Sequence, residues 1–299
     1  MDILDYAFMQ RALLAAVLVG VIAPAVGIYL VQRRQALMGD GIGHVAMTGV
    51  GLGFLLSTSP VWMATAVSVL GAVLMELIRW YGRTRGDIAL AMLFYGGMAG
   101  GVMFTSLAGG STANLTSYLF GSLSTVSESD VTAIFLLAAF VLAVTLGLRR
   151  QLFAVSQDEE FARVTGLPVR ALNLLTAVTA AVTVTVAMRV VGLLLVSALM
   201  VVPVAAAQQL TRSFAATFAV AVAIGVSVTI GGTVTSFYQD VPPGSTIVLL
   251  TIGAFIALTA LATPLARRRA RALAAAQAAG DPVECAIPAT RGPESTVGV

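Results

Sequence analysis

Asp40 and His44 are the residues whose types and spacing best suit a chemical role in this sequence. They stand four positions apart at the start of an apolar segment, and His44 is the only histidine in the 299-residue chain. On a helix, positions i and i+4 share a face, so the pair could present a carboxylate oxygen and an imidazole nitrogen to one ion. These donors suit Zn²⁺, Mn²⁺ and Fe²⁺. The alternative is structural, with Asp40 capping the helix and His44 hydrogen-bonded to a neighbouring helix.

The sequence excludes several catalytic centres. All 17 basic residues are arginine, so the lysine with which a P-loop holds phosphates is absent. A single histidine rules out the His-Glu-x-x-His motif of a metalloprotease. The one cysteine, Cys285, rules out disulfides within the chain and thiolate metal clusters. We therefore expect that the chain is not an enzyme, and that ATP, if it powers the chain, is hydrolysed by a partner subunit.

The elements that position the pair are expected to be membrane-spanning helices. Of all residues, 58% are hydrophobic and only 10% are charged, whereas a soluble domain carries about a quarter charged residues. Such a chain needs lipid as its solvent, and the predicted fold is an all-α, polytopic transmembrane bundle. Eight helices are the alternative to nine, because the sixth and seventh segments form one apolar stretch broken only by Arg189. The nine segments are 8–31, 37–57, 60–79, 87–108, 131–148, 171–188, 190–208, 213–236 and 245–266.

Arginine positions predict the orientation of this bundle. Connections on the cytoplasmic side of a membrane carry an excess of basic residues, which favours an outer N-terminus and an inner C-terminus. Only Arg11 and Arg189 then lie outside, with Arg291 in the remote tail. Fourteen arginines lie inside: Arg33, Arg34, Arg79, Arg83, Arg85, Arg149, Arg150, Arg163, Arg170, Arg212, Arg267, Arg268, Arg269 and Arg271. Because they are scattered over the ends of apolar runs, nucleic acid is not an expected partner.

Two further features concern the organisation of the chain. Residues 1–271 are predicted to form the transmembrane domain, and residues 272–299 a disordered cytoplasmic tail, because the tail is rich in Ala, Pro, Gly and Thr and has no apolar periodicity. Glycines within the predicted helices are expected to mark places where helices pack closely, since small residues allow backbones to approach in lipid. They include Gly96, Gly97, Gly100, Gly101, Gly231 and Gly232.

Five motifs follow one another along the chain. The first comprises Arg33-Arg34, Ala36-Leu37, Gly39-Asp40 and His44. The others are Tyr118–Leu123 with Val126-Ser127, Asp158–Gly166, Val191–Pro203 and Asp240–Gly244. In this order the motifs resemble the permease family of zinc, manganese and iron ABC importers, over about residues 8 to 266. The resemblance implies the membrane-spanning subunit of an importer in the bacterial cytoplasmic (inner) membrane. Its expected partners are a cytoplasmic ABC ATPase, an extracytoplasmic metal-binding protein and a second copy of the chain. The metal is cargo, and no permanently bound cofactor is expected.

The resemblance also assigns a role to the Asp158–Gly166 segment, which matches the part of these permeases that docks on the ATPase. Its predicted coupling residues are Asp158, Glu159, Glu160, Phe161, Ala162, Arg163 and Gly166. The residues themselves predict a short amphipathic helix, stopped by Gly166 and Pro168, in the longest connection of the arginine-rich side, 149–170. A plain solvated connector is the alternative.

Other acidic residues have less specific roles. Glu128, Asp130 and Asp240 form a predicted external set, which docks a metal-loaded binding protein or attracts cations; ordinary solvated loop charge is the alternative. Glu76 is expected to pair with Arg79 or to reach the membrane interface, and not to bind metal.

The leading hypothesis for function is therefore a permease subunit that passes a divalent metal along Asp40 and His44. The alternative is a stand-alone carrier driven by an ion gradient, but such carriers usually hold several intramembrane acids, and Asp40 is the only one predicted well inside a span. The residues do not choose among zinc, manganese and iron, because donor type alone does not set selectivity.

Overall fold

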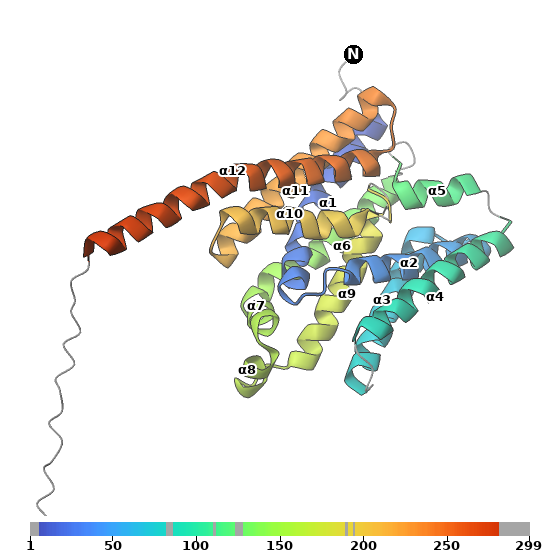
Figure 1. The fold of residues 1–299 in the computed structure, drawn as a ribbon. Helices are drawn as coiled ribbons and strands as arrows, with labels where there is room; N and C mark the ends of the chain where they lie inside the picture. Colours follow the sequence, from blue (N-terminus) through green and yellow to red (C-terminus); the bar gives the residue numbers. More distant parts are fainter. Residues whose placement is uncertain are drawn as a thin grey trace, which may run out of the picture. The chain divides into compact units, whose positions relative to one another are not determined.

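The computed structural model describes residues 6–81, 86–109, 112–122, 128–188, 191–193 and 195–280, and every regular element in these ranges is an α-helix (Figure 1). In chain order the helices are α1 (Ala7–Gln32), α2 (Met38–Leu55), α3 (Pro60–Tyr81), α4 (Gly86–Leu107), α5 (Thr112–Phe120), α6 (Glu128–Gly147), α7 (Arg149–Gln157), α8 (Glu159–Val164), α9 (Val169–Ala187), α10 (Val196–Leu210), α11 (Phe214–Gln239) and α12 (Pro243–Gly280).

Each of the nine predicted apolar segments overlaps one helix, and the nine helices are α1, α2, α3, α4, α6, α9, α10, α11 and α12. Within the described ranges, six helices are long and apolar enough to cross a membrane, and a seventh crossing results if α6 and α7, bent by 68°, count as one broken span. Helix α10 has only 15 residues, and α2 is not among the six. The all-helical class is thus confirmed, while the count of eight or nine spans stays a prediction.

Helix α1 lies at the centre of the packing. It contacts α6, α9, α10 and α11, and most of its side chains are buried, including Ile22, Ile28 and Leu30 with no exposed surface. Helix α2 lies against α3 and α4 and also contacts α9 and α10. Large apolar side chains on the outer faces are exposed, as expected where lipid is the solvent.

The chain divides into two compact units at residue 260. The first unit, through residue 259, contains the helical bundle together with the first part of α12. The second contains the rest of α12, which continues as helix to Gly280, so residues 272–280 of the predicted tail are helical. Residues 281–299 of that tail, including Cys285, lie outside the described residues.

Helices α2 and α4 are in backbone contact at Gly97. A Cβ atom added to Gly97 would lie only 2.5 Å from the carbonyl carbon of His44, and one added to Gly101 would lie 2.6 Å from Cγ of Met47. The prediction that helical glycines mark close packing is confirmed at these two positions. It is wrong for Gly96, whose added Cβ would meet nothing within 4 Å.

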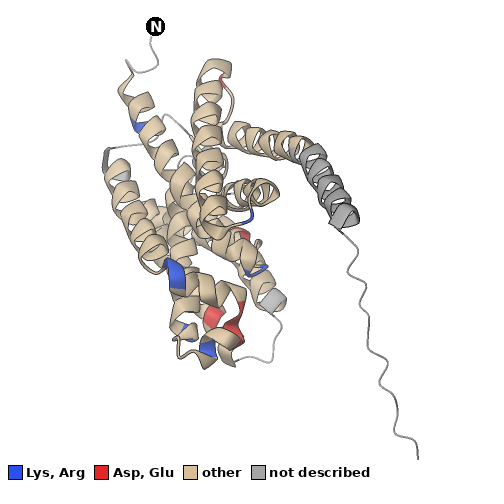
Figure 2. Cartoon of the chain, turned by 90° about the vertical axis from the view of Figure 1, so that its left-hand side faces the viewer, with Lys and Arg blue, Asp and Glu red and all other residues tan. Residues whose placement is uncertain are grey.

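Charged residues are sparse and gather where the helices end (Figure 2). Most of those drawn lie in the lower part of the view, where the short helix α8 carries Glu159 and Glu160. The connection between α1 and α2 belongs to this end. There Arg34 adopts a left-handed backbone conformation with φ of 57°, and Gln35 N–H donates to the carbonyl of Leu30 to close the last turn of α1.

Candidate functional site

His44 and Asp40 lie in the first two turns of α2, as predicted. The Nδ1 atom of His44 lies 2.9 Å from the backbone oxygen of Asp40. A carbonyl oxygen only accepts hydrogen bonds, so in this contact Nδ1 carries the proton. In the neutral imidazole the lone pair then resides on Nε2, which is the nitrogen left to bind a metal ion. The contact fixes the tautomer with a backbone group and leaves the Asp40 carboxylate for another partner.

The two specific contacts named in the structural alternative differ from those in the described part of the chain, while His44 itself is buried. The N-cap of α2 is Leu37, with no side-chain cap hydrogen bond, so Asp40 does not cap the helix. His44 bonds its own helix, and its contact with a neighbouring helix is through rings: its ring centroid lies 4.0 Å from that of Phe94 on α4, with the planes tilted by 36°. Phe94 packs on the imidazole, and Gly97 lies close to the backbone of His44.

Helix α10 brings a polar side chain close to the Asp40 carboxylate. The Oγ atom of Ser197 lies 3.5 Å from Oδ1 of Asp40, the outer limit for a hydrogen bond. Among the described residues, no group of three or more His, Cys, Asp or Glu side chains could hold a metal ion. Asp40 and His44 together would give a transition metal two side-chain donors, fewer than the four or more that such an ion takes.

The predicted coupling segment forms α8 with well-defined ends. The Asp158 carboxylate caps the helix by accepting from the N–H groups of Glu160 and Phe161, at 2.9 and 3.0 Å. At the other end Gly166 has a φ of 82°, a left-handed conformation that favours glycine. Its N–H donates to Arg163 and the next N–H to Ala162, which completes a Schellman ending. The predicted helix and its stop are confirmed.

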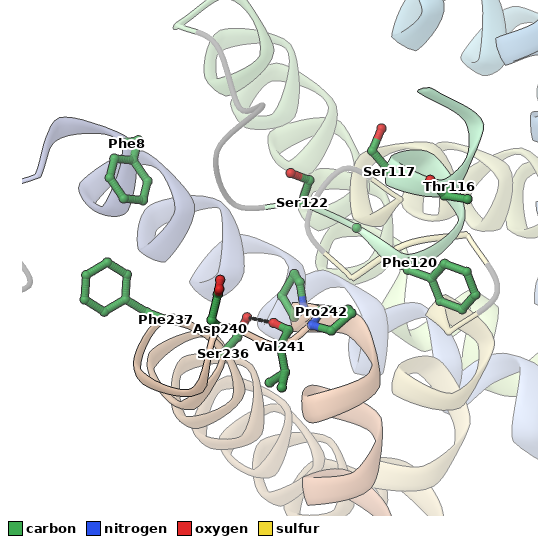
Figure 3. Close-up of a pocket in the computed structure, with 12 residues that line it drawn as sticks. Phe8, Thr116, Ser117, Phe120, Ser122, Ser236, Phe237, Asp240, Val241 and Pro242 are labelled. Carbon is green, nitrogen blue, oxygen red and sulfur yellow. Dashed lines mark hydrogen bonds between the residues drawn. The ribbon is translucent and has the colours of Figure 1, made fainter. Parts of the chain in front are cut away.

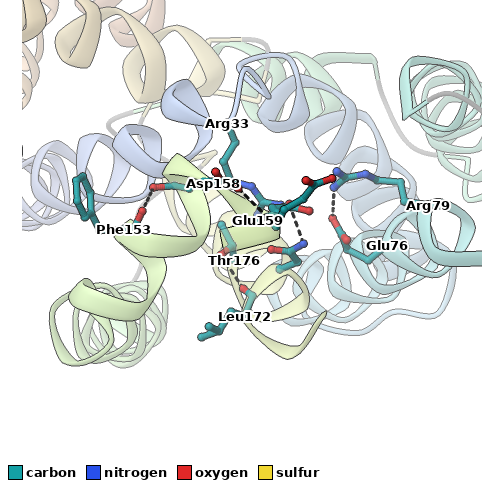
Figure 4. A network of polar contacts seen from close by, with 11 residues as sticks. Arg33, Glu76, Arg79, Phe153, Asp158, Glu159, Leu172 and Thr176 are labelled. Atoms are coloured by element: carbon teal, nitrogen blue, oxygen red, sulfur yellow. Dashed lines mark hydrogen bonds and ion pairs between the residues drawn. The ribbon is translucent and has the colours of Figure 1, made fainter. Parts of the chain in front are cut away.

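An ion pair ties α8 to the end of α1. Nη2 of Arg33 lies 2.5 Å from Oε1 of Glu159, and the same oxygen accepts from Asn173 of α9 at 3.0 Å (Figure 4). The Arg33 side chain is 6% exposed and that of Glu159 is 40% exposed. Burial lowers the pKa of the Arg33 guanidinium, and the Glu159 carboxylate opposes this by favouring the charged form.

The remaining side chains of α8 divide between the bundle and solvent. Ala162 is completely buried, while Phe161 and Val164 are 64% and 86% exposed. Glu160 and Arg163 are exposed beside them. An exposed phenylalanine on a short charged helix outside the spans is an available contact surface for another protein.

Glu76 pairs with Arg79 one turn away on α3, at 2.6 Å (Figure 4). The Glu76 side chain is only 2% exposed, so this arginine compensates a carboxylate that would otherwise be costly to bury. The predicted pairing is confirmed.

Of the predicted external acids, the structure places only the side chain of Asp240. It follows α11 with a left-handed φ of 51° and lies exposed in a cavity of about 610 Å³. Phe8 and Phe237 line the same cavity (Figure 3), with their ring centroids 6.3 Å apart. Glu128 and Asp130 belong to the first turn of α6, but their side chains lie outside the described residues.

A family comparison decides what kind of chain this is. The model of the ABC 3 transport family matches residues 5–262. The chain belongs to the ABC 3 transport family. The predicted resemblance over about residues 8 to 266 is thereby confirmed.

Individual relatives of this ABC 3 chain agree over most of its length. A metal transport system membrane protein of Treponema pallidum is 34% identical over 268 residues, covering 89% of the chain and 99% of that protein. A manganese transport system membrane protein of Halalkalibacterium halodurans is 30% identical, covering 83% and 85%. Among solved structures, PsaBC from Streptococcus pneumoniae in complex with a Fab is 28% identical, with a TM-score of 0.78 over 85% of this chain and 92% of that one.

Sequence reasoning missed four residues that surround the candidate groups of this ABC 3 chain. They are Arg33 and Asn173, which bind Glu159, and Phe94 and Ser197, which approach His44 and Asp40. Arg33 and Ser197 lie within motifs that carried the resemblance, but a single sequence gives no sign of their partners. Phe94 and Asn173 had no signal at all.

Proposed function

We propose that this chain is the membrane-spanning permease subunit of an ABC importer that moves a divalent transition metal, Zn²⁺, Mn²⁺ or Fe²⁺, into the cytoplasm. The observation that carries the proposal is the Arg33–Glu159 ion pair. It connects a short, solvent-exposed helix to the corner that leads directly into α2, where the Asp40 and His44 donors lie. Membership of the ABC 3 transport family supports the same assignment.

Asp40 and His44 act as a transient relay for the metal. Two donors from one chain hold an ion weakly, and weak binding allows release on the inner side. Two copies of the chain enclosing one pathway would double the number of donors. The fixed Nδ1 proton directs Nε2 of His44 to the ion, and the partly exposed Asp40 carboxylate supplies charge.

The exposed face of α8 receives the motion of a cytoplasmic ATPase, which hydrolyses the ATP. Phe161, Glu160 and Arg163 form the contact, whereas buried Ala162 and ion-paired Glu159 pass the movement to the bundle. Because Arg33 directly follows α1 and precedes α2 by only a few residues, its displacement shifts the start of α2. The metal donors move with that helix.

The membrane orientation belongs to this proposal. The N-terminus is outside and the C-terminus inside a bacterial cytoplasmic membrane, because the arginine-rich end faces the cytoplasm. The cavity around Asp240, with Glu128 and Asp130 as further acids on that side, receives the extracytoplasmic binding protein. A gradient-driven carrier is the weaker candidate, since Glu76, the buried acid of α3, is already paired with Arg79.

The test replaces each donor separately in the complete transporter. His44→Ala and Asp40→Asn are expected to insert and to co-purify with the ATPase as the wild type does, yet to lower metal uptake at least about tenfold. Removing a residue that only hydrogen-bonds a metal ligand already costs about tenfold or more, so the loss of a ligand itself should cost at least as much. The control is Ser227→Ala, an exposed residue of α11 that bonds only its own helix. Wild-type uptake by His44→Ala for all three metals would show that the pair is structural.

A further inference from the structure

A groove beside the bend between α6 and α7 combines positive charge with an aromatic wall. It has a volume of about 500 Å³ and is lined by residues of α1, α6, α7 and α11, among them Tyr29, Arg149, Arg150, Phe153, Phe214 and Ala215. None of these residues has a role in the proposed metal path or in α8. We propose that this groove binds one anionic phospholipid of the cytoplasmic leaflet, and the choice of leaflet rests on the orientation proposed above.

The charge of the groove is unbalanced. Arg149 and Arg150 are both exposed, no carboxylate lines the groove, and neither arginine has an ion-pair partner in the part of the chain that the structure describes. Two neighbouring guanidinium groups repel each other unless an anion lies between or beside them. The planar donor fork of arginine is well suited to a phosphate group.

The floor and wall of the groove are apolar. The Tyr29 hydroxyl donates to the carbonyl of Thr145 at 3.0 Å, which joins α1 to α6 at the groove, since both residues line it. The Phe214 ring lies 5.7 Å from that of Tyr29 and 4.7 Å from that of Phe153, measured between centroids. A free phosphate ion would use the arginines alone, while a lipid would use the aromatic wall as well.

The position of the groove selects a lipid over a soluble ligand. Arg149 is the first residue of α7, one residue after α6 ends, and α7 turns away from α6 by 68°, so the arginines lie where the apolar part of α6 ends. Anionic headgroups occupy this level of a membrane, and basic pockets between transmembrane helices on the cytoplasmic side bind them. Below it, Leu146 on α6 is 49% exposed and continues an apolar surface along which an acyl chain can lie.

The bound lipid would also affect coupling, because α7 is the only element between α6 and α8. Fixing Arg149 and Arg150 to a headgroup holds α7 at the membrane surface. Helix α8 follows α7 after a single residue, Asp158. The lipid would therefore limit the freedom of the segment that contacts the ATPase in the proposed function.

The experiment measures lipid binding to the purified full-length complex by native mass spectrometry. The probes are dioleoyl phosphatidylglycerol, dioleoyl phosphatidylcholine with the same acyl chains, and glycerol phosphate with no acyl chains. Wild type should retain phosphatidylglycerol and neither of the other two. Each basic residue near an anionic bilayer surface changes affinity about fivefold, so Arg149→Ala/Arg150→Ala should weaken phosphatidylglycerol binding about 30-fold.

Two variants make the result specific to the groove. Arg170→Ala/Arg212→Ala removes two exposed arginines from the same end of the bundle but outside the groove, and should bind phosphatidylglycerol as wild type does. Ala215→Trp keeps all charges but fills the groove, and should lose the lipid. Unchanged phosphatidylglycerol binding by Arg149→Ala/Arg150→Ala would overturn the proposal, as would equal retention of the two lipids by wild type.

The experiment distinguishes failure of the lipid proposal from failure of the proposed metal transport. If Arg149→Ala/Arg150→Ala keeps the lipid but loses the ATPase or the second copy on purification, the groove is a protein contact and the lipid proposal is wrong. If Arg149→Ala/Arg150→Ala loses the lipid and His44→Ala abolishes uptake, both proposals stand. If Arg149→Ala/Arg150→Ala loses the lipid but His44→Ala keeps full uptake, the lipid groove is supported and the metal relay is refuted.

Discussion

Replacing Gly97 by alanine should disturb His44 from the opposite helix, and Gly96 provides the matched control. Both glycines lie within α4, so both substitutions gain the same helix propensity, about 0.5 to 1 kcal/mol. They differ in what the added methyl group meets. At Gly96 it meets nothing within 4 Å, whereas at Gly97 it lies 2.5 Å from the carbonyl carbon and 2.7 Å from the carbonyl oxygen of His44.

The size of the effect follows from these distances. Ordinary contact begins at 3.4 Å, so α2 and α4 must separate by about 0.9 Å at this point. The atoms of His44 in this clash belong to the backbone, and a Cβ atom is fixed to its own backbone, so neither can turn away. The separation also stretches the 2.7 Å hydrogen bond from Thr48 to the Gly97 carbonyl. Overpacking of this kind costs about 1 to 3 kcal/mol, which should be the difference in unfolding free energy between the two variants.

The assay compares the thermal unfolding midpoints of Gly96→Ala and Gly97→Ala in detergent and their metal uptake in proteoliposomes with the ATPase. Gly96→Ala should match or slightly exceed the wild-type midpoint and transport normally. Gly97→Ala should unfold at a lower temperature and lose uptake, because His44 and its stacked partner Phe94 no longer keep their positions. Equal midpoints and equal uptake for the two variants would refute the close approach of α2 and α4.

Three further predictions concern the coupling end and the topology. Arg33→Glu should reduce uptake, since it removes an ion pair whose charged hydrogen bond contributes about 1.5 to 3 kcal/mol. The exchange Arg33→Glu/Glu159→Arg should recover part of the lost uptake, and a double variant no better than either single one would argue against the Arg33–Glu159 ion pair. Gly166→Ala places a side chain at a φ of 82° and should destabilise the end of α8 by about 1 kcal/mol. The variant should therefore co-purify less ATPase, and recovery of as much ATPase as the wild type would contradict this. Reporter fusions at Gln239 should read external and those at Arg271 cytoplasmic, and a reversed pattern would invert the proposed orientation.

Local features of the molecule could be predicted because their causes are local. The low charge content requires lipid, and the apolar runs gave α4 as 87–108, where the structure has Gly86–Leu107. Asp158 and Gly166 bracket α8 as a cap and a stop, because side-chain and backbone bonds at helix ends form between residues only a few positions apart. The shared face of Asp40 and His44 follows from helical spacing alone.

Contacts between distant segments were beyond such reasoning. Arg33 and Glu159 are 126 positions apart, and nothing in either local sequence distinguishes this pairing from the many other pairings open to an arginine and a glutamate. Residues 191–193 and 195, predicted as the start of a helix, instead form the approach to α10, so that helix begins only at Val196. Apolar composition is the same whether a segment is helical or turns, and packing against other segments decides between the two.

The sequence by itself therefore determined the solvent, the helical class and the two polar segments to which we assign roles in the proposed function. Tertiary structure alone decided how these segments are connected: Phe94 and Gly97 fix His44, and Arg33 joins α8 to the start of α2. The physical reason is the distance along the chain over which each interaction acts. Solvation and helix periodicity act on each residue and its near neighbours, whereas the stacking of two rings and the pairing of two buried charges depend on which helices the whole chain brings into contact.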